Sequence, residues 1–368
     1  MSQTKVLSKD SFGTLVKNIR RVILAARQTT VRQIDFLQVV TGFEIGRRIV
    51  EYEQQGADRA KYGAKVLVNL SQKLSIEFGS GFSSTNLKLM RQFFLQYRNR
   101  IGQTLSDQLP SGAKGQTVPD QCQKPLPAQS RFNLSWSHYV FLLGIKDSEE
   151  RNFYEIEATQ ENWSLRELKR QFNSGLYERL ALSRNKTAIR KLALEGQKVV
   201  KPEDMIKNPY VLEFLGLNEK SEYSESDLER AIIDKIEHFL LELGKGFLFE
   251  ARQKRFTFDE DHFFVDLVFY NRLLRCYVLI DLKMGKLTHQ DLGQMQMYVN
   301  YFDRFVKRQG ENPTVGIILC RKKHDALVEI TLPKKVNIHA AEYQLYLPSK
   351  EVLKKKLLDW TKDEEVEE

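Results

Sequence analysis

Cysteine and histidine are scarce in this sequence and are not spaced as metal ligands. The three cysteines, Cys122, Cys276 and Cys320, lie far apart and form no CxxC pair, so they indicate neither a disulfide framework nor a cysteine zinc site. The six histidines show neither HxH nor HExxH spacing, which argues against a histidine zinc site. We therefore expect a chain that works in a reducing cytoplasm and does not use zinc.

Long apolar runs are also missing. The runs Val22–Ala26 and Val315–Cys320 are far shorter than the about 20 residues that a membrane-spanning helix needs. The first residues, Met1–Lys5, lack the apolar core of a signal peptide. The sequence therefore predicts no membrane role.

The composition is that of a folded, basic, two-domain protein. A chain of 368 residues is too long for one ordinary domain, and 42% hydrophobic with 29% charged residues is typical of a globular protein. The net charge of +9 and the pI near 9.2 favour a polyanionic partner such as nucleic acid. Charge alone does not decide this, because many basic proteins never bind nucleic acid.

The first 200 residues read as an all-α domain with one insertion. Residues 103–130 are rich in Gln, Pro, Ser and Gly and nearly empty of large apolar residues, which predicts a flexible insertion. Around it, apolar residues recur at helical spacing. The predicted helices cover residues 11–27, 32–55, 61–78, 137–143, 149–159 and 164–179.

Beyond a connecting segment at residues 201–225, the periodicity changes to an α/β pattern over residues 226–360. Helices are predicted at 226–243 and 288–307, and strands at 247–258, 262–270, 276–284 and 314–320. Residues 361–368 form an acidic tail that we expect to be a solvated end. The fold class is therefore α+β in two domains, an all-α N-terminal domain followed by an α/β domain.

Two neighbouring strands carry the residues of most chemical interest. Asp281 and Lys283 lie two apart in one strand and so point to the same face. The preceding strand is equally apolar and holds Asp266 in its middle. If the strands form a hairpin that turns around residues 272–275, a symmetric register places Asp266 opposite Asp281, close enough to share a cation. Such hard oxygen ligands suit Mg²⁺, with Mn²⁺ as an alternative.

Two further helices contribute candidates. Glu229 falls inside the apolar arc of the 226–243 helix, where an unpaired carboxylate is costly to bury and needs a partner. In the 288–307 helix, Thr288 and Asp291 form a capping pair, and Gln294 lies one turn from Tyr298. Gln294 either approaches a phosphate or, with Gln296, is simply solvated; the sequence leaves both open.

Asp281 and Lys283 also have a purely structural explanation, an ion pair at a strand end. For one such pair alone this explanation is the better one, because salt bridges outnumber catalytic sites. Two facing acids, a lysine on the same face and Glu229 in an apolar arc are together hard to explain without a shared ion. The set favours a metal-assisted hydrolysis in which Lys283 orients water or stabilises the transition state.

These motifs resemble the PD-(D/E)xK nuclease superfamily and, more narrowly, the two-domain bacterial YhcG-like nucleases. The likeness spans nearly the whole chain and is carried by Phe43–Ile49, Leu134–Tyr139, Asn162–Leu168, Tyr210–Gly216, Val265–Tyr270, Asp281–Lys283 and Gly293–Tyr298.

The resemblance implies a restriction-endonuclease-like α/β core, with a mixed sheet flanked by helices and a divalent metal. Asp266 and Asp281 would be ligands, Glu229 a supporting acid and Lys283 the catalytic lysine, while Gln294 resembles a glutamine that helps to place the substrate. Two positions depart from the superfamily's pattern. Val265 stands where its name expects proline, and Asp281 where glutamate is commoner.

The helical half offers a second candidate for nucleic-acid contact. Residues 64–100 resemble a helix-turn-helix with Asn86, Lys88 and Arg91 on its second helix, although that helix also carries core residues and helical hairpins are common. In the second half, basic residues such as Arg255 and Lys322 are candidates to follow a phosphate backbone.

Two functions remain in competition. The first is a nuclease that hydrolyses nucleic acid, DNA above RNA. The second is a DNA-binding or adaptor protein that keeps the nuclease fold with little or no cleavage. The sequence does not decide the oligomeric state, and a homo-oligomer is compatible with it.

Overall fold

The computed structural model describes residues 9–55, 61–98, 132–184, 186–217, 223–258, 260–333 and 336–366. Residues Met1–Arg151 with Ala158–Leu165 form one compact unit, and Asn152–Glu157 with Arg166–Glu368 form another. Residues 166–200, which we placed with the helical half, thus pack with the second unit, and the domain boundary at residue 200 stays a prediction. The insertion predicted at 103–130 lies outside the described residues.

The first unit is helical. Its elements are α1 (Lys9–Gln55), α2 (Lys61–Phe78), the 3-10 turn Ser80–Phe82, α3 (Ser84–Tyr97), α4 (Trp136–Leu143) and the two ends of α5 (Ser148–Gln160). The expectation of two helices over residues 11–55 is wrong, since α1 is continuous. The segment between them has no glycine or proline, and residues such as Thr29 and Thr30 lower helix propensity too little to end a helix.

Aromatic side chains join α1, α3 and α4. The ring of Phe93 in α3 lies 6.0 Å from Phe43 of α1, and 5.4 and 5.0 Å from Trp136 and Tyr139 of α4. Phe93 and Phe43 are both buried. These edge-to-face and tilted contacts make the aromatic cluster the core of the first unit.

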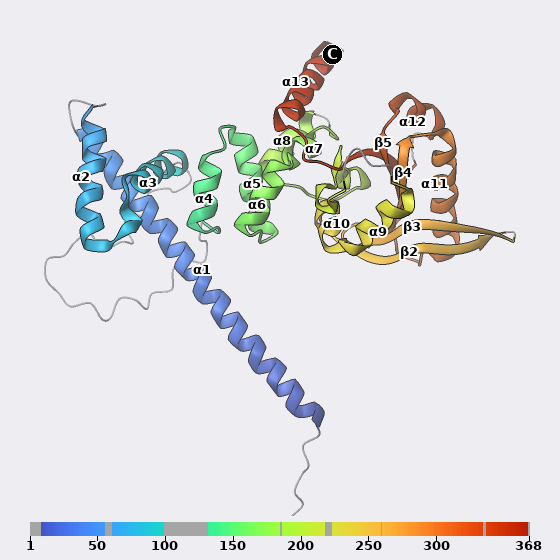
Figure 1. Ribbon diagram of the computed structural model, residues 1–368, viewed down its shortest axis with the longest axis horizontal. Helices are drawn as coiled ribbons and strands as arrows, with labels where there is room; N and C mark the ends of the chain where they lie inside the picture. The colour runs from blue at the N-terminus through green and yellow to red at the C-terminus, as the bar shows by residue number, and fades with distance from the viewer. Residues whose placement is uncertain are drawn as a thin grey trace, which may run out of the picture. The chain divides into compact units, whose positions relative to one another are not determined.

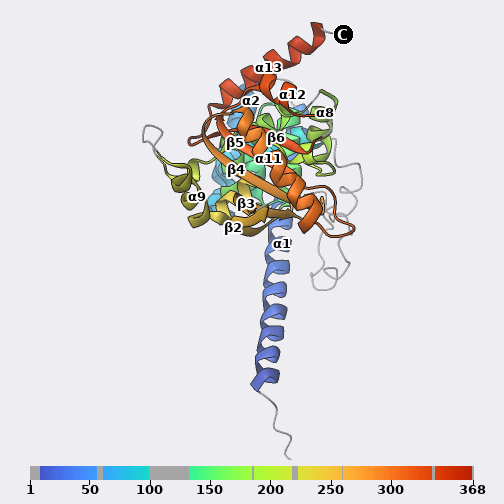
Figure 2. The same ribbon diagram turned by 90° about the vertical axis from the view of Figure 1, so that its right-hand side faces the viewer.

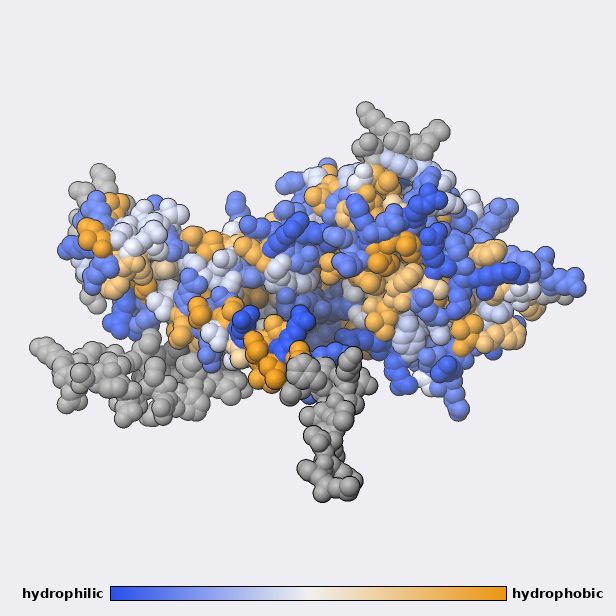
Figure 3. All heavy atoms as spheres, turned by 60° about the horizontal axis from the view of Figure 1, so that its bottom comes forward, coloured by the Kyte–Doolittle hydropathy of each residue, from blue (hydrophilic) through white to orange (hydrophobic). Residues whose placement is uncertain are grey.

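The first half of α1 extends beyond this core (Figures 1 and 2). Apolar side chains are exposed along it. Figure 3 shows that apolar side chains also reach the surface in patches among hydrophilic ones. No helix in the described part of the chain, α1 included, is both long and apolar enough to cross a membrane.

The second unit begins with α6 (Leu165–Asn173), α7 (Leu176–Ala181) and α8 (Lys186–Glu195). The single helix predicted at 164–179 is interrupted by Gly175, whose φ of 65° is left-handed and favours glycine. The C-terminal α13 (Lys350–Val366) packs against α7, and it includes residues 361–366 of the acidic segment for which a solvated end is predicted.

A six-stranded mixed sheet forms the centre of this unit (Figure 1). Its order is β1-β6-β5-β4-β3-β2; β1, β6, β5 and β4 run parallel, whereas β3 is antiparallel to both neighbours. The strands are β1 (Tyr210–Val211), β2 (Phe247–Phe258), β3 (Asp261–Asn271), β4 (Cys276–Lys286), β5 (Val315–Lys322) and β6 (Ile338–Gln344). The predicted fold class, a helical region followed by a mixed sheet with flanking helices, is confirmed.

Helices cover both faces of the sheet. On one face α9 (Glu225–Asp234) and α10 (Ile236–Leu243) bury one apolar core, and on the other α11 (His289–Tyr301) buries a second. The predicted helix 226–243 is two helices, because Lys235 between them leaves helical geometry at φ −125°. The predicted helix 288–307 ends as the π turn Phe302–Val306, and α12 (Asp325–Thr331) follows β5.

A fully buried ion cluster ties α7 to the sheet. Arg179 donates to Glu242 Oε1 at 2.5 Å, and the same oxygen accepts from the backbone N–H of Val211 in β1 at 2.9 Å. The ammonium of Lys207 donates to the backbone carbonyl of Glu242. Burial lowers the pKa of Lys207 to about 8, against the attraction of Glu242. One carboxylate therefore joins α7, α10 and the edge strand.

Replacing Arg179 should reveal how much the second unit depends on this cluster. Arg179→Ala leaves Glu242 buried without its main partner, and breaking a buried pair in this way costs about 3–5 kcal/mol. We expect that fall in the free energy of unfolding by urea denaturation. Arg190→Ala, at an exposed position of α8, is the control and should change it by less than about 0.5 kcal/mol. A loss below about 1 kcal/mol in Arg179→Ala would contradict this account.

Lys207 should make stability rise with pH in the alkaline range. The folded protein releases the Lys207 proton near pH 8, whereas the unfolded chain holds it until about pH 10.5, so the unfolded state binds more protons between these values. The stability of wild type relative to Lys207→Met should increase by about 2 kcal/mol between pH 7.5 and 10. Urea unfolding of both proteins at the two pH values measures this difference; a constant or falling difference would show that Lys207 is not desolvated.

Candidate active site

The acids of β3 and β4 lie side by side. Leu267 pairs with Ile280 across the antiparallel hairpin, so the next step of the register brings Asp266 beside Asp281. Asp266 Oδ2 accepts the backbone N–H of Leu282 at 2.9 Å, which fixes its carboxylate on β4. The symmetric hairpin register predicted from the sequence is confirmed.

Asp281 is in an unfavourable place for a lone anion. Its surface is only 3% exposed. Burial, followed by the neighbouring charge of Asp266, raises the pKa of Asp281 to about 7, although Lys283 acts in the opposite direction. Two carboxylates that share a buried site favour either a proton or a cation between them.

The positively charged side chain of Lys283 lies next to Asp281. Its Nζ lies 2.9 Å from Asp281 Oδ2, 3.8 Å from Glu225 and 4.0 Å from Asp291. Burial opposes the charge, but the nearby acids outweigh it and raise the pKa of Lys283. The ion pair that the purely structural explanation predicts is therefore present, yet it leaves Asp281 with a raised pKa.

Glu229 reaches the same region from α9. It is 4% exposed, which confirms that this carboxylate faces the core. Its Oε2 accepts from the amide of Gln253 at 2.6 Å, and its Oε1 lies 3.0 Å from Arg252 Nε. The Gln253 amide also donates to Asp266 Oδ1 at 3.0 Å. Glu229 and Asp266 are thus linked through one side chain of β2.

Sequence reasoning missed Gln253. Arg252 pairs with Leu267 and Lys254 with Val265, so Gln253 lies opposite Asp266 in the β2–β3 hairpin. The predicted strands 247–258 and 262–270 indicate a hairpin here, but residues 259–261 between them leave its register open by one residue, so they do not single out Gln253. Its φ of 43° could not have been foreseen, since a left-handed backbone is rare for a residue other than glycine inside a strand.

The first turn of α11 contributes Asp291, which lies 4.0 Å from Lys283. Asp291 and Thr288 form the predicted capping box, with the Thr288 side chain accepting from Asp291 N. Gln294 donates to the hydroxyl of Tyr298 at 2.6 Å, so its amide is engaged within the helix. Burial and then Asp281 raise the pKa of Tyr298 to about 12. A substrate-placing role for Gln294 stays a prediction.

The helix-turn-helix candidates in the first unit have structural partners. Asn86 caps the preceding turn and accepts from the indole of Trp136 at 3.2 Å, and Arg91 pairs with Glu53 of α1 at 2.6 Å. Lys88 is exposed. In the second unit Arg255, beside His262, and Lys322 are exposed as well. Nucleic-acid contact by these residues stays a prediction.

Of the three acids, Asp266 and Asp281 are placed to bind a divalent cation together, but Glu229 is not close enough to complete a three-residue site. Among the residues described, no three His, Cys, Asp or Glu side chains converge closely enough to hold a metal ion. The amide of Gln253 stands between Glu229 and Asp266, while Asp266 and Asp281 are adjacent. Two adjacent carboxylates, one with a raised pKa, are a suitable donor set for Mg²⁺ or Mn²⁺, which take a few protein oxygens and keep several waters.

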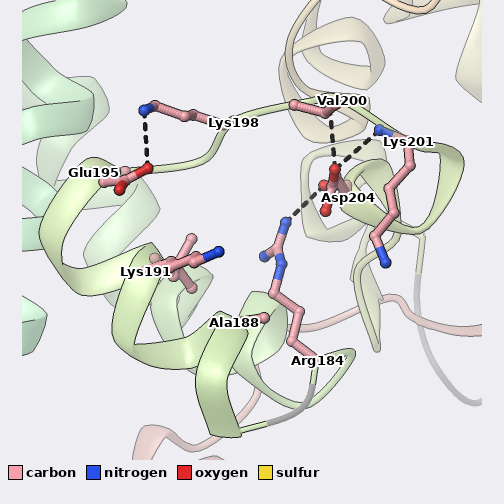
Figure 4. Close-up of a pocket in the computed structure, with 10 residues that line it drawn as sticks. Arg184, Ala188, Lys191, Glu195, Lys198, Val200, Lys201 and Asp204 are labelled. Atoms are coloured by element: carbon pink, nitrogen blue, oxygen red, sulfur yellow. Dashed lines mark hydrogen bonds and ion pairs between the residues drawn. The ribbon is translucent and has the colours of Figure 1, made fainter.

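A pocket of about 410 Å³ lies elsewhere in the second unit, around α8 and the segment that follows it (Figure 4). Its two acids are already engaged. Glu195 pairs with Lys198 at 2.8 Å, and the Asp204 carboxylate accepts from the backbone N–H groups of Val200 and Lys201. None of the acid-site residues lines it, so the pocket and the acid site are separate features.

Comparisons with known proteins agree on one family. Residues 203–358 match the YhcG PDDEXK nuclease domain, and residues 18–179 match the DUF1016 N-terminal domain. The chain is 40% identical over 347 residues to the Escherichia coli (strain K12) protein named "Putative nuclease YhcG", which covers 92% of each chain. A weaker structural match is a repair endonuclease from Pyrococcus abyssi, with 17% identity, a TM-score of 0.24, and coverage of 36% of this chain and 50% of that one.

Removing one of the adjacent carboxylates should stabilise the metal-free protein. Asp281→Asn relieves the repulsion by Asp266 and the cost of burying a charge, while Lys283 keeps Glu225 and Asp291 nearby. With a chelator at pH 8, we expect the free energy of unfolding to rise by about 1–3 kcal/mol. Asp234→Asn, at an exposed position of α9, should change it by less than about 0.5 kcal/mol. A purely structural ion pair predicts the opposite, a less stable Asp281→Asn.

Proposed function

Because this chain belongs to the YhcG family of PDDEXK nucleases, we propose that it hydrolyses phosphodiester bonds of nucleic acid, with DNA as the substrate, at a divalent-cation site. Asp266 and Asp281 would bind the cation and Glu229 would support it. Mg²⁺ is the proposed ion, with Mn²⁺ as a substitute, and the proposed location is the cytoplasm.

One observation supports this proposal above the others: two adjacent strand carboxylates, one of which, Asp281, is buried. The pKa of Asp281, raised to about 7 by burial and by Asp266, means that these residues hold a second negative charge poorly. A structural site would be expected to replace one of them with an apolar or neutral residue. Keeping both is understandable where a dication neutralises them.

Each side chain then has a chemical task. A bound divalent cation supplies a Lewis acid that lowers the pKa of a water molecule and neutralises charge on the phosphate. Lys283, on the same face as Asp281, is placed to donate to that water or to a phosphate oxygen. To do so its ammonium must leave Asp281 at least in part, and Glu225 and Asp291 offer it alternative partners.

The proposed DNA substrate rests on charge and position. The net charge of +9 favours a polyanion, and Arg255 and Lys322 lie exposed on the strands of the nuclease domain. In the helical unit, Lys88 is the exposed member of the set Asn86, Lys88 and Arg91. Gln294, one turn from the acid site, is a further candidate for placing the phosphate.

A second function, nucleic-acid binding with little or no cleavage, is favoured by one observation. In the described structure, Lys283 pairs with Asp281 and Gln253 bridges the other two acids, so each of the three acids already has a side-chain partner within the protein. An adaptor protein that retained the nuclease fold would have this arrangement permanently.

Cleavage assays on wild type, Asp281→Ala and Lys283→Met distinguish the two functions. Supercoiled, linear, single-stranded and branched DNA, together with RNA, would be incubated with Mg²⁺ or Mn²⁺. We expect wild type to cut at least one DNA form, and each variant to be slower by at least about 100-fold, because each removes a charge that acts on the transition state.

Lys286→Met is the matched control, since Lys286 lies on the same strand but is exposed. It should keep the wild-type rate within about threefold. Failure of wild type to cut any substrate, or equal cutting by wild type and both variants, would overturn the proposed function or its assignment to these residues.

A further inference from the structure

We propose that Gln253 is a positioning residue of the cation site, whose neutral amide holds Glu229 and Asp266 together before the cation arrives. The proposal rests on the proposed function of the site. It adds a residue from a third strand, β2, to the set on α9, β3 and β4. The expected consequence is that Gln253 sets the affinity for the divalent cation rather than the rate of the chemical step.

The hydrogen bonds around the two acids assign this role. Gln253 Nε2 donates to Glu229 Oε2 at 2.6 Å and to Asp266 Oδ1 at 3.0 Å. The remaining oxygens have their own partners, Arg252 for Glu229 and the backbone N–H of Leu282 for Asp266. Asp266 is therefore held at both oxygens, whereas Glu229 accepts a hydrogen bond only at Oε2, from Gln253, and has Arg252 at ion-pair distance from Oε1. Gln253 is the residue that the two acids share. Each carboxylate oxygen has a second lone pair, so this network still leaves Asp266 able to bind a cation.

The amide is chemically suited to this position. An NH₂ group carries two N–H donors and no charge, so one side chain can satisfy two carboxylates without neutralising them. A lysine or arginine in the same place would cancel the negative charge that attracts a dication. Gln253 thus fixes the orientation of the two carboxylates and, being neutral, does not cancel the negative charge that attracts a divalent cation.

The backbone of Gln253 supports a role beyond packing. Its φ of 43° lies in the left-handed region, which glycine adopts at little cost and other residues resist. The residue is half-buried and lies opposite Asp266 in the hairpin. If only the local fold mattered, glycine would be the better residue here. The amide is the part of the side chain that glycine cannot supply.

The test compares the binding of Mn²⁺ alone by calorimetry to chelator-stripped, full-length proteins. Gln253→Gly removes the amide and fits the backbone, and Gln253→Ala removes the amide but keeps a Cβ. We expect both to raise the Kd for Mn²⁺ by about 10–100-fold, the usual effect of removing a residue that orients metal ligands. Lys254→Ala, the neighbouring residue on the same strand, should leave the Kd within about threefold of wild type.

A second measurement separates positioning from general damage. The Mn²⁺ concentration that gives half-maximal cleavage should rise in Gln253→Gly by about the same factor as the Kd. The rate at saturating Mn²⁺ should stay within about threefold of wild type, because a positioned cation restores the site. Metal-free Gln253→Gly should unfold within about 5 °C of the wild-type temperature, since relief of the left-handed backbone offsets part of the lost hydrogen bonds.

The results separate failure of the Gln253 proposal from failure of the proposed nuclease function. If wild type binds Mn²⁺ and both Gln253 variants bind it within about threefold of wild type, the positioning role is wrong and the nuclease proposal is unaffected. If wild type binds Mn²⁺ but cuts nothing, the cleavage proposal fails, and the calorimetric comparison still decides the role of Gln253. If wild type binds no Mn²⁺, both proposals are wrong. A lower saturated rate with an unchanged Kd would also overturn the positioning role.

Discussion

The structure of the site depends on one constraint, the position of half-buried Asp266 beside buried Asp281 on neighbouring antiparallel strands. Burial and mutual repulsion disfavour two negative charges at this position, and neighbouring residues stabilise the two carboxylates with ion pairs and hydrogen bonds. Lys283 pairs with Asp281, while the backbone of β4 and the amide of Gln253 hold Asp266. A divalent cation would satisfy the same constraint and supply chemistry as well.

The rest of the second unit keeps these strands in register and brings helices to them. The buried carboxylate of Glu242 connects α7, α10 and β1, and so links the start of the unit to its sheet. On the sheet, α9 delivers Glu229 from one side and the capped start of α11 delivers Asp291 to Lys283 from the other. The Arg179–Glu242 pair is buried and hydrogen-bonded to the backbone of β1, whereas Asp281, although paired with Lys283, keeps a raised pKa.

Much of this arrangement could be predicted from the sequence. Strands β2 to β5 followed from the apolar segments of the sequence, whereas β1 and β6 were not predicted. The adjacency of Asp266 and Asp281 followed from the hairpin register. The burial of Glu229 followed from its place in an apolar arc. Helix breaks were missed where one residue decides them, as at Gly175 and Lys235, because periodicity continues across the break. Gln253 was missed because a polar strand residue has no distinctive pattern, and its contacts depend on tertiary structure.

Anomalous diffraction at the manganese edge from crystals of wild type soaked in Mn²⁺ would test the central claim most directly, that the two adjacent carboxylates form a cation site. The account predicts an anomalous peak within bonding distance of both Asp266 and Asp281, about 2.0–2.3 Å from their oxygens, with the ammonium of Lys283 moved away from Asp281. A crystal without such a peak, in which Lys283 still pairs with Asp281, would contradict it and favour a nuclease fold that has become a binding protein.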